Sequence, residues 1–203
     1  MSILAKRLDA HFVACAAAAG AAVVASTQKS EAAIVWSGLV NLPIPGDVDG
    51  IYVNLATGLT GLTGGATPGW DINPYFGGNT MYTAAPGYGC VPDASATGVA
   101  ALLAGVLVDG TSATSFVSSG ADFPTADPGA YYGFRFQDET AGGAVRYGWA
   151  RLYRGSATTS PGLLYEWAYD NTGAGILTGA VPAPGSITLL ALGAVGLTGR
   201  RRK

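Results

Sequence analysis

The chain has 203 residues, of which 31 are glycine, and only 12% of its residues are charged. Residues 33–180 contain four arginines, no lysine and eleven acidic residues, and this formal charge of −7 excludes a basic nucleic-acid-binding face. Abundant glycine and few charges favour an exported, turn-rich, all-β protein over a helical cytosolic one.

The N-terminal residues have the pattern of a secretory signal peptide. A short basic region is followed by an uncharged, alanine-rich run at residues 12–25 and then by a polar stretch. Because signal peptidases need small residues just before the cut, we expect residues 1–32 to be removed by cleavage between Ala32 and Ala33. Cleavage after Ala25 is the alternative.

Removal of this segment limits the chemistry of the remaining domain. The only histidine, His11, and one of the two cysteines, Cys15, would leave with it. The exported domain then has no imidazole, which excludes His-based nucleophilic catalysis and His-ligated metal sites. Cys90 remains as a single cysteine, which we interpret as a buried small hydrophobe rather than a reactive thiol or a cross-link between chains. We expect no cofactor.

Short apolar segments separated by Gly, Pro, Asn and Asp predict short strands along the domain. In residues 51–55, apolar and polar side chains alternate, as in a half-buried strand. Residues 99–108 are ambiguous, because their Ala and Leu favour a helix whereas the glycines around them favour short pieces. Further segments with strand character are residues 34–40, 70–75 and 80–82.

The clearest hairpin joins strands at residues 131–137 and 145–154 through a turn at residues 138–143. Phe134 and Phe136 alternate with Arg135 and are expected to share one face. A third strand is expected at residues 163–170. Strict alternation there would place Tyr165, Trp167 and Tyr169 on one face and Leu164, Glu166 and Ala168 on the other.

Strands at this spacing, without a long helical pattern, predict an all-β fold. We expect residues 33–180 to form an antiparallel β-sandwich or jelly-roll-like domain. This domain would lie between an N-terminal signal helix and a C-terminal hydrophobic helix.

The aromatic side chains of the last strands have two interpretations. They could form a sugar-stacking platform for an extracellular polysaccharide, but aromatic residues at strand spacing more often belong to the core, because each buries a large apolar area. The candidate stacking residues are Tyr147, Trp149, Trp167 and Tyr169, with Tyr153 beside them.

Acidic residues offer two further candidate sites. Asp47 and Asp49 resemble part of a calcium loop, but such a site needs about six to eight oxygens, so a turn is favoured. Glu139 and Glu166 are the only glutamates of the domain, and a glycosidase needs two carboxyls at a fixed separation. We expect Glu139 to be solvated in its turn and Glu166 to pair with an arginine of a neighbouring strand, so the domain is expected to be non-catalytic.

The C-terminal segment, residues 181–203, has three consecutive parts. A proline-rich break is followed by an uncharged run at residues 186–199 and then by four cations. The run spans roughly 21 Å as a helix, against a bilayer core of about 30 Å, so it is a marginal membrane anchor. The cations favour the cytoplasmic side, which places the domain outside. The break and the cations are Val181, Pro182, Ala183, Pro184, Gly185, Arg200, Arg201, Arg202 and Lys203.

This segment resembles the PEP-CTERM sorting signal of exported bacterial proteins, except that Ala183 replaces the usual glutamate. The resemblance implies sorting by an exosortase-like membrane protease to the cell envelope, the cell surface or the extracellular matrix, with at least transient membrane attachment. A plain membrane anchor is the alternative. The domain also resembles the ectodomain of short PEP-CTERM proteins in the pieces DGIYVN, GWDINPY, GFRF, YGWARL and YEWAYD.

Three functions follow from these features. The first is a non-catalytic exported protein sorted to the cell envelope. The second is a carbohydrate-binding surface module of the same architecture. The third, with the least support, is a His-free polysaccharide hydrolase or lyase.

Overall fold

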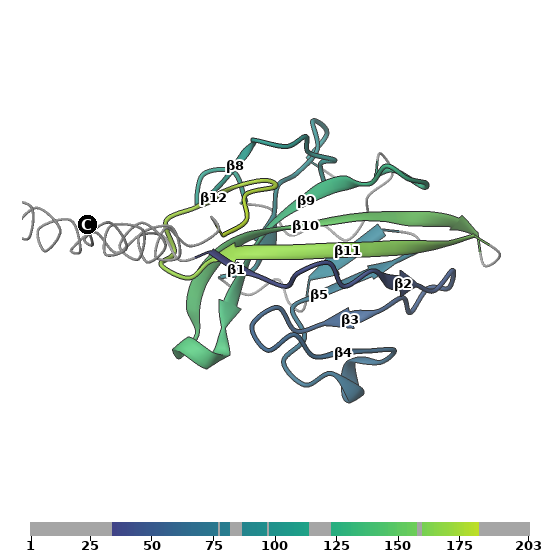
Figure 1. Cartoon of the computed structure of the whole chain (residues 1–203), viewed down its shortest axis with the longest axis horizontal. Helices are drawn as coiled ribbons and strands as arrows, with labels where there is room; N and C mark the ends of the chain where they lie inside the picture. The colour runs from purple at the N-terminus through teal and green to yellow at the C-terminus, as the bar shows by residue number, and fades with distance from the viewer. Residues whose placement is uncertain are drawn as a thin grey trace, which may run out of the picture. The chain divides into compact units, whose positions relative to one another are not determined.

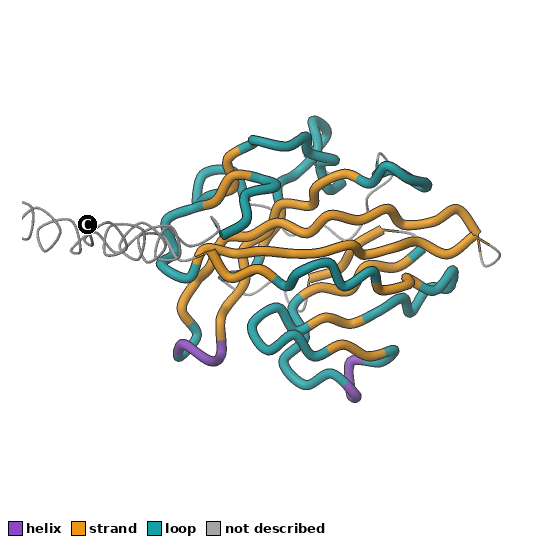
Figure 2. The backbone as a smooth tube through the Cα atoms, viewed as in Figure 1, coloured by secondary structure: helices purple, strands orange, loops and turns teal. Residues whose placement is uncertain are grey.

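A computed structural model describes residues 34–76, 78–81, 87–96, 98–113, 123–157 and 160–182. These residues form antiparallel strands joined by loops, with helix only in two short 3₁₀ turns, η2 (Gly64–Ala66) and η3 (Glu139–Ala141) (Figure 2). The expected all-β fold is therefore confirmed. In this part of the chain no helix is long and apolar enough to cross a membrane, and both expected terminal helices lie outside it.

The larger sheet contains the long hairpin predicted from the sequence. Its strand order is β1-β11-β10-β9-β7, and β2 also pairs with β11 (Figure 1). Every pairing in it is antiparallel. The strands are β1 (Ile34–Trp36), β2 (Leu42–Ile44), β7 (Gly89–Cys90), β9 (Ala130–Asp138), β10 (Ala144–Ala157) and β11 (Ser160–Asp170).

A smaller sheet and a two-stranded ribbon complete the described part of the domain. The smaller sheet has the order β4-β3-β5-β6, and its strands are β3 (Tyr52–Val53), β4 (Thr60–Gly61), β5 (Ile72–Tyr75) and β6 (Gly78–Met81). The ribbon pairs β8 (Leu107–Val108) with β12 (Ile176–Leu177). The ambiguous residues 99–108 thus form β8 and isolated bridges rather than a helix.

The main core contains side chains from both sheets. Phe134 and Phe136 are fully buried in it, as the alternation around Arg135 predicts, and Cys90 is fully buried beside them. From the smaller sheet and the residues next to it, this cluster takes Ile51, Val53, Leu55 and Ile72. Because apolar faces of both sheets meet in one cluster, the described residues pack as a sandwich.

A second, smaller core lies on the opposite face of the larger sheet. Trp149 and Ala168 face each other across β10 and β11, and both are fully buried there. Val108 and Ile176 of the ribbon cover them. The larger sheet is therefore buried on its inner face and partly covered on its outer face.

The expected alternation in β11 is wrong in its first half. Arg151 lies opposite Glu166, but the next residue, Leu152, lies opposite Leu164, so Tyr165 is an extra residue in the ladder. Such a β-bulge shifts the alternation by one position. Leu164 consequently joins Trp167 in the inner core instead of facing away from it.

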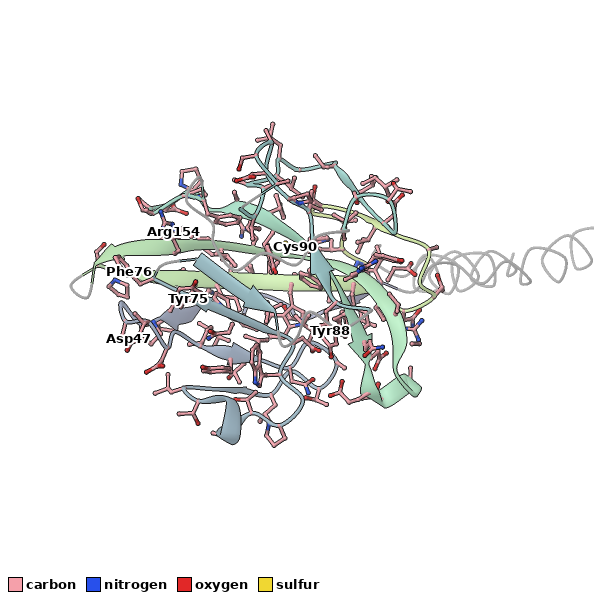
Figure 3. The ribbon with its side chains drawn as sticks, turned by 180° about the vertical axis from the view of Figure 1, so that it is seen from behind. Asp47, Tyr75, Phe76, Tyr88, Cys90 and Arg154 are labelled. Atoms are coloured by element: carbon pink, nitrogen blue, oxygen red, sulfur yellow. The ribbon has the colours of Figure 1, made fainter. Side chains whose placement is uncertain are left out.

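Arg154 links the two sheets at one end of the sandwich. From β10, its Nη1 donates to the carbonyl of Phe76, 3.1 Å away, in the turn after β5. Its Nε donates to the carbonyl of Phe123 at 3.2 Å. Figure 3 shows Arg154 beside Phe76, with Asp47 nearby, and the Asp47 carbonyl accepts from the Phe76 amide at 3.3 Å.

Candidate functional site

The sorting segment begins directly after the last strand. Ala180 and Ile34 are both half-buried against the second core, so the start of the expected mature domain and the start of the segment lie at the same end of the fold. Val181 is 42% exposed and Pro182 is also exposed. The other residues expected to guide cleavage and sorting lie outside the described residues: Ala32, Ala33, Ala183, Pro184, Gly185, Arg200, Arg201 and Arg202.

The four aromatic residues proposed for sugar stacking do not form one open platform. Trp149, Trp167 and Tyr169 are all buried, and only Tyr147 is partly accessible. Trp167 and Tyr169 belong to the inner core, whereas Trp149 and Tyr147 belong to the outer one. The structure therefore places Trp149, Trp167 and Tyr169 in the core rather than on an accessible surface.

A different row of aromatic and charged side chains is accessible on the outer face of the larger sheet. Glu166 is at its centre: Oε1 accepts from Arg151 Nε and Oε2 from the Trp36 indole N–H, both at 2.9 Å. The Arg151 guanidinium lies 4.4 Å from the centroid of the Tyr165 ring, a cation–π contact. The Tyr153 ring follows at 6.0 Å from Tyr165. We call Trp36, Glu166, Arg151, Tyr165 and Tyr153 the outer row.

The outer row combines flat rings with polar groups at an accessible surface. Trp36 is 40% exposed, and Tyr153, Arg151 and Tyr165 are half-buried. The Tyr165 hydroxyl donates to Asp127, and desolvation, followed by this carboxylate, raises the pKa of Tyr165 to about 12. Tyr165 is protonated at neutral pH, and its one hydroxyl hydrogen is donated to Asp127.

Sequence reasoning found only part of this row. The sequence places Tyr153 beside the candidate stacking residues, and the predicted pairing of Glu166 with an arginine is confirmed by the Arg151 contact. Trp36 was missed because its partner Glu166 is 130 residues away in the chain. Tyr165 was missed because the bulge, which brings its ring to Arg151, leaves no mark in the alternation of residues 163–170.

The two glutamates do not form a catalytic pair. Asp138, next to Glu139, lies opposite Ala144, and Glu166 lies opposite Arg151 of the same strand. These positions are seven residue steps apart on β10, which is about 23 Å of strand at roughly 3.3 Å per residue. Glycosidases place their carboxyls within about 10 Å of each other.

Glu139 instead contributes to a polar cluster between η3 and the smaller sheet. It is exposed and accepts a hydrogen bond from the amide of buried Asn54 at 2.5 Å. Asp71, fully buried, accepts from the Leu55 amide at 2.7 Å and from the Tyr88 hydroxyl at 3.4 Å. Burial raises the pKa of Asp71 to about 7, and Glu139 adds to the effect. The Asp71 carboxyl is enclosed, so its protonation state affects the stability of the fold and the group is not accessible to a ligand.

The Asp47–Gly50 segment is a turn, as favoured from the sequence. The Asp47 carboxylate accepts from the backbone amides of Asp49 and Gly50, at 3.1 and 2.9 Å. Among the residues that the structure describes, no three His, Cys, Asp or Glu side chains are grouped so as to hold a metal ion.

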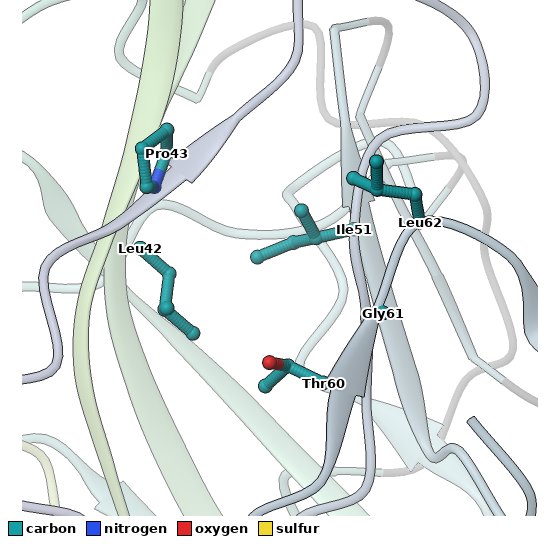
Figure 4. A pocket seen from close by; sticks show the side chains of 6 residues that line it. All are labelled: Leu42, Pro43, Ile51, Thr60, Gly61 and Leu62. Atoms are coloured by element: carbon teal, nitrogen blue, oxygen red, sulfur yellow. The ribbon is translucent and has the colours of Figure 1, made fainter. Parts of the chain in front are cut away.

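A small apolar cavity of about 230 Å³ opens between β2 and the β3–β4 side of the smaller sheet (Figure 4). Small-molecule pockets usually enclose about 300–1,000 Å³ and contain several polar groups. Only one side chain here, Thr60, is polar. The lining residues are Leu42, Pro43, Ile51, Thr60, Gly61 and Leu62.

Comparison with known proteins identifies only the C-terminal segment. Residues 180–203 match the family model described as the PEP-CTERM protein-sorting motif. No curated protein and no solved structure matches the chain. The resemblance of the tail is therefore confirmed, and the match does not extend into the β-domain.

Proposed function

We propose that this protein is a non-catalytic β-domain that its C-terminal sorting motif directs to the cell surface or extracellular matrix. The chain carries a PEP-CTERM protein-sorting motif, which is a signal for export and envelope-associated sorting through an exosortase-type membrane enzyme. The motif match at residues 180–203 is the observation that carries this proposal. The domain itself supplies the accessible start of the motif, because Val181 and Pro182 are exposed next to β12.

We further propose that the processing enzyme cuts near Pro184. Pro182 and Pro184 fix φ and lack amide donors, so they favour an extended backbone that an enzyme can bind. The apolar run at residues 186–199 and the four following cations would hold this segment at the bilayer. After the cut, the domain would leave its apolar run behind.

Intact-mass analysis of the protein recovered from the envelope and the medium tests this cleavage. We expect a chain that ends near Pro184. Replacement of Arg200, Arg201, Arg202 and Lys203 by serine should reduce the processed form, because each cation contributes about 1 kcal/mol near an anionic leaflet. A recovered chain that still ends at Lys203 would show that the tail is only an anchor.

A second candidate function is carbohydrate binding by the outer row. The supporting observation is that Trp36, 40% exposed, lies on the same surface as the Arg151–Glu166 pair and two tyrosine rings. Flat aromatic faces beside charged hydrogen-bonding groups suit sugar rings, which present both apolar and hydroxyl surfaces. This site replaces the largely buried set proposed from the sequence.

A glycan array with the full chain tests this second function. Trp36→Ala should remove binding to any polysaccharide that the wild-type chain retains. Val35→Ala is the matched control, because Val35 is 38% exposed on the same strand and lies opposite Tyr169 rather than beside Glu166. Equal binding by both variants, or none by the wild-type chain, would reject the outer row as a glycan site.

A further inference from the structure

The β8–β12 ribbon and the residues next to it in the chain expose five large apolar side chains. Leu103 is 81% exposed, Leu107 50%, Leu177 49%, Val181 42% and Val106 38%. We call these five residues the ribbon patch. Figure 1 shows β8 and β12 side by side, and Leu107 lies directly opposite Leu177 in their pairing.

The alternation of the ribbon explains why Leu107 and Leu177 face outward. Val108 and Ile176 form the neighbouring cross-strand pair, and both are buried against Trp149. Because successive strand residues point to opposite faces, Leu107 and Leu177 must point away from that core. Among the described residues nothing covers Leu107 and Leu177. Polar side chains at these two positions would serve equally well if the only role of the ribbon were to cover the core.

Hydrogen bonds of the buried Thr178 hold the backbone at two positions of the patch, Leu103 and Val106. The Thr178 hydroxyl, 2% exposed, donates to the Leu103 carbonyl at 2.7 Å and accepts from the Val106 amide at 2.9 Å. The Thr178 amide donates to the Val106 carbonyl at 2.9 Å. The turn that carries Leu103 and Val106 is therefore tied to β12, next to the start of the sorting motif.

The patch is also free of charge. Residues 98–108 and 174–182 contain no Asp, Glu, Lys or Arg. Solvent-facing protein surface normally carries many charged side chains, and contiguous exposed apolar surface marks contacts with membranes or other proteins. A lipid interface tolerates uncharged apolar side chains and penalises buried charge, so this composition fits a bilayer surface.

The length of the chain after the ribbon patch limits the distance between the patch and the bilayer. Four residues, or five Cα–Cα steps, separate Val181 from Ser186, where the uncharged run begins. A chain of this length spans at most about 18 Å when fully extended. While the tail is attached, Val181, at one edge of the ribbon patch, is therefore held within that distance of the start of the run that is proposed to enter the bilayer.

We propose that the ribbon patch is a membrane-contacting surface that seats the domain on the lipid bilayer before the sorting tail is cut. This inference rests on the proposed function, since it needs the tail as an anchor. Contact through Leu103, Leu107 and Leu177 would fix the orientation of the domain and present Val181–Pro182 to the processing enzyme at the membrane surface.

Hydroxyl-radical footprinting of the full chain in protein-free liposomes of phosphatidylcholine and phosphatidylglycerol tests the contact. Oxidation of Leu103, Leu107 and Leu177 is compared with that of Leu62 and Val48, which are 64% and 78% exposed and lie elsewhere in the domain. We expect the three ribbon leucines to be oxidised several-fold more slowly than these internal controls, with the chain floating with the liposomes.

A double variant, Leu107→Asp with Leu177→Asp, separates the patch from the tail. It should still float with the liposomes through the tail, because the tail is unchanged, but the protection of Leu103 should be lost. The fold is expected to persist, since both positions are about half exposed, and an unchanged circular dichroism spectrum checks this.

Each contrary outcome has a distinct meaning. A chain that floats while Leu103, Leu107 and Leu177 oxidise like Leu62 overturns the bilayer contact and leaves the sorting function intact. A chain that does not float overturns the contact and the anchoring step together. Protection that appears only in native membranes containing the processing enzyme, or that rises with the protein-to-lipid ratio, assigns the patch to a protein partner or a second copy and also overturns the lipid contact.

Discussion

Arg151 and Glu166 lie directly opposite each other on β10 and β11, and Arg151 Nε lies 2.9 Å from Glu166 Oε1. The Arg151 side chain is 32% exposed and the Glu166 side chain 11%, so the pair is only partly screened by solvent. Because Glu166 also accepts from the Trp36 indole at 2.9 Å, one carboxylate fixes the edge strand β1 against the sheet and orients the guanidinium over Tyr165.

Replacement of Glu166 therefore tests the organisation of the outer row. We expect Glu166→Ala to lower the free energy of unfolding by about 1–2 kcal/mol, because it removes a charge-assisted hydrogen bond and the acceptor for Trp36. Glu166→Gln, which keeps an acceptor for the indole, should lose less. Urea titration gives both values, and equal losses would show that the charge rather than the hydrogen bonding carries the effect.

The larger sheet could be predicted from local patterns. The alternation of Phe134 and Phe136 around Arg135 is strict, both rings are buried, and the turn at Asp138 follows where expected. Local chemistry also predicts the turn after Asp47, whose carboxylate accepts two nearby backbone amides. These features depend on contacts within a few residues, which sequence patterns record.

The surface of that sheet could not be predicted in the same way. The bulge at Tyr165 reverses the alternation of one half of β11, and single-sequence periodicity contains no signal for it. The hydrogen bond between Trp36 and Glu166 joins residues 130 positions apart in the chain. Trp149 is buried because the ribbon packs over it, and the ribbon forms only when β8 pairs with β12. Accessible and buried aromatic residues therefore look alike in the sequence.

The inner core predicts a large cost for Phe134→Ala. Phe134 is fully buried and its ring lies 6.0 Å from that of Phe136, so truncation should lower the free energy of unfolding by about 3–5 kcal/mol. Leu62→Ala is the matched control. Leu62 is 64% exposed and should change stability by less than about 0.5 kcal/mol. Similar denaturation midpoints for the two variants would contradict the assignment of the inner face.

Two glycines with similar backbone angles predict different responses to alanine. Gly50 and Gly58 have φ of +59° and +75°, so alanine at either position pays for a left-handed conformation, about 1–2 kcal/mol. A Cβ on Gly50 would also lie 2.1 Å from the Pro74 carbonyl oxygen, whereas one on Gly58 would meet nothing within 4 Å. We expect Gly50→Ala to cost at least about 1–3 kcal/mol more than Gly58→Ala in thermal or urea unfolding. Equal costs would mean that β5 moves away freely.

Asp71 predicts an unusual pH dependence of stability. Its pKa in the folded domain is about 7, raised from 3.8 mainly by burial, so between these two values the folded chain holds a proton that the unfolded chain has released. Unfolding then releases a proton, and stability should fall as pH rises from about 4 to 7, by up to about 1.4 kcal/mol per pH unit. The full contribution of the protonated form is present below pH 4 and is lost as pH rises through 7.

Asp71→Asn should remove this slope, because the amide stays neutral while its oxygen can still accept from the Leu55 amide, which lies 2.7 Å from the carboxylate in the wild-type chain. In urea titrations, the free energy of unfolding of the variant should therefore increase relative to that of the wild-type chain as pH rises from 4 to 8. Asp109→Asn is the control: hydrogen bonds, first from the Thr111 side chain, lower the pKa of Asp109, so its titration lies below this window and the slope should persist. A slope that survives Asp71→Asn would assign the pH dependence to another group.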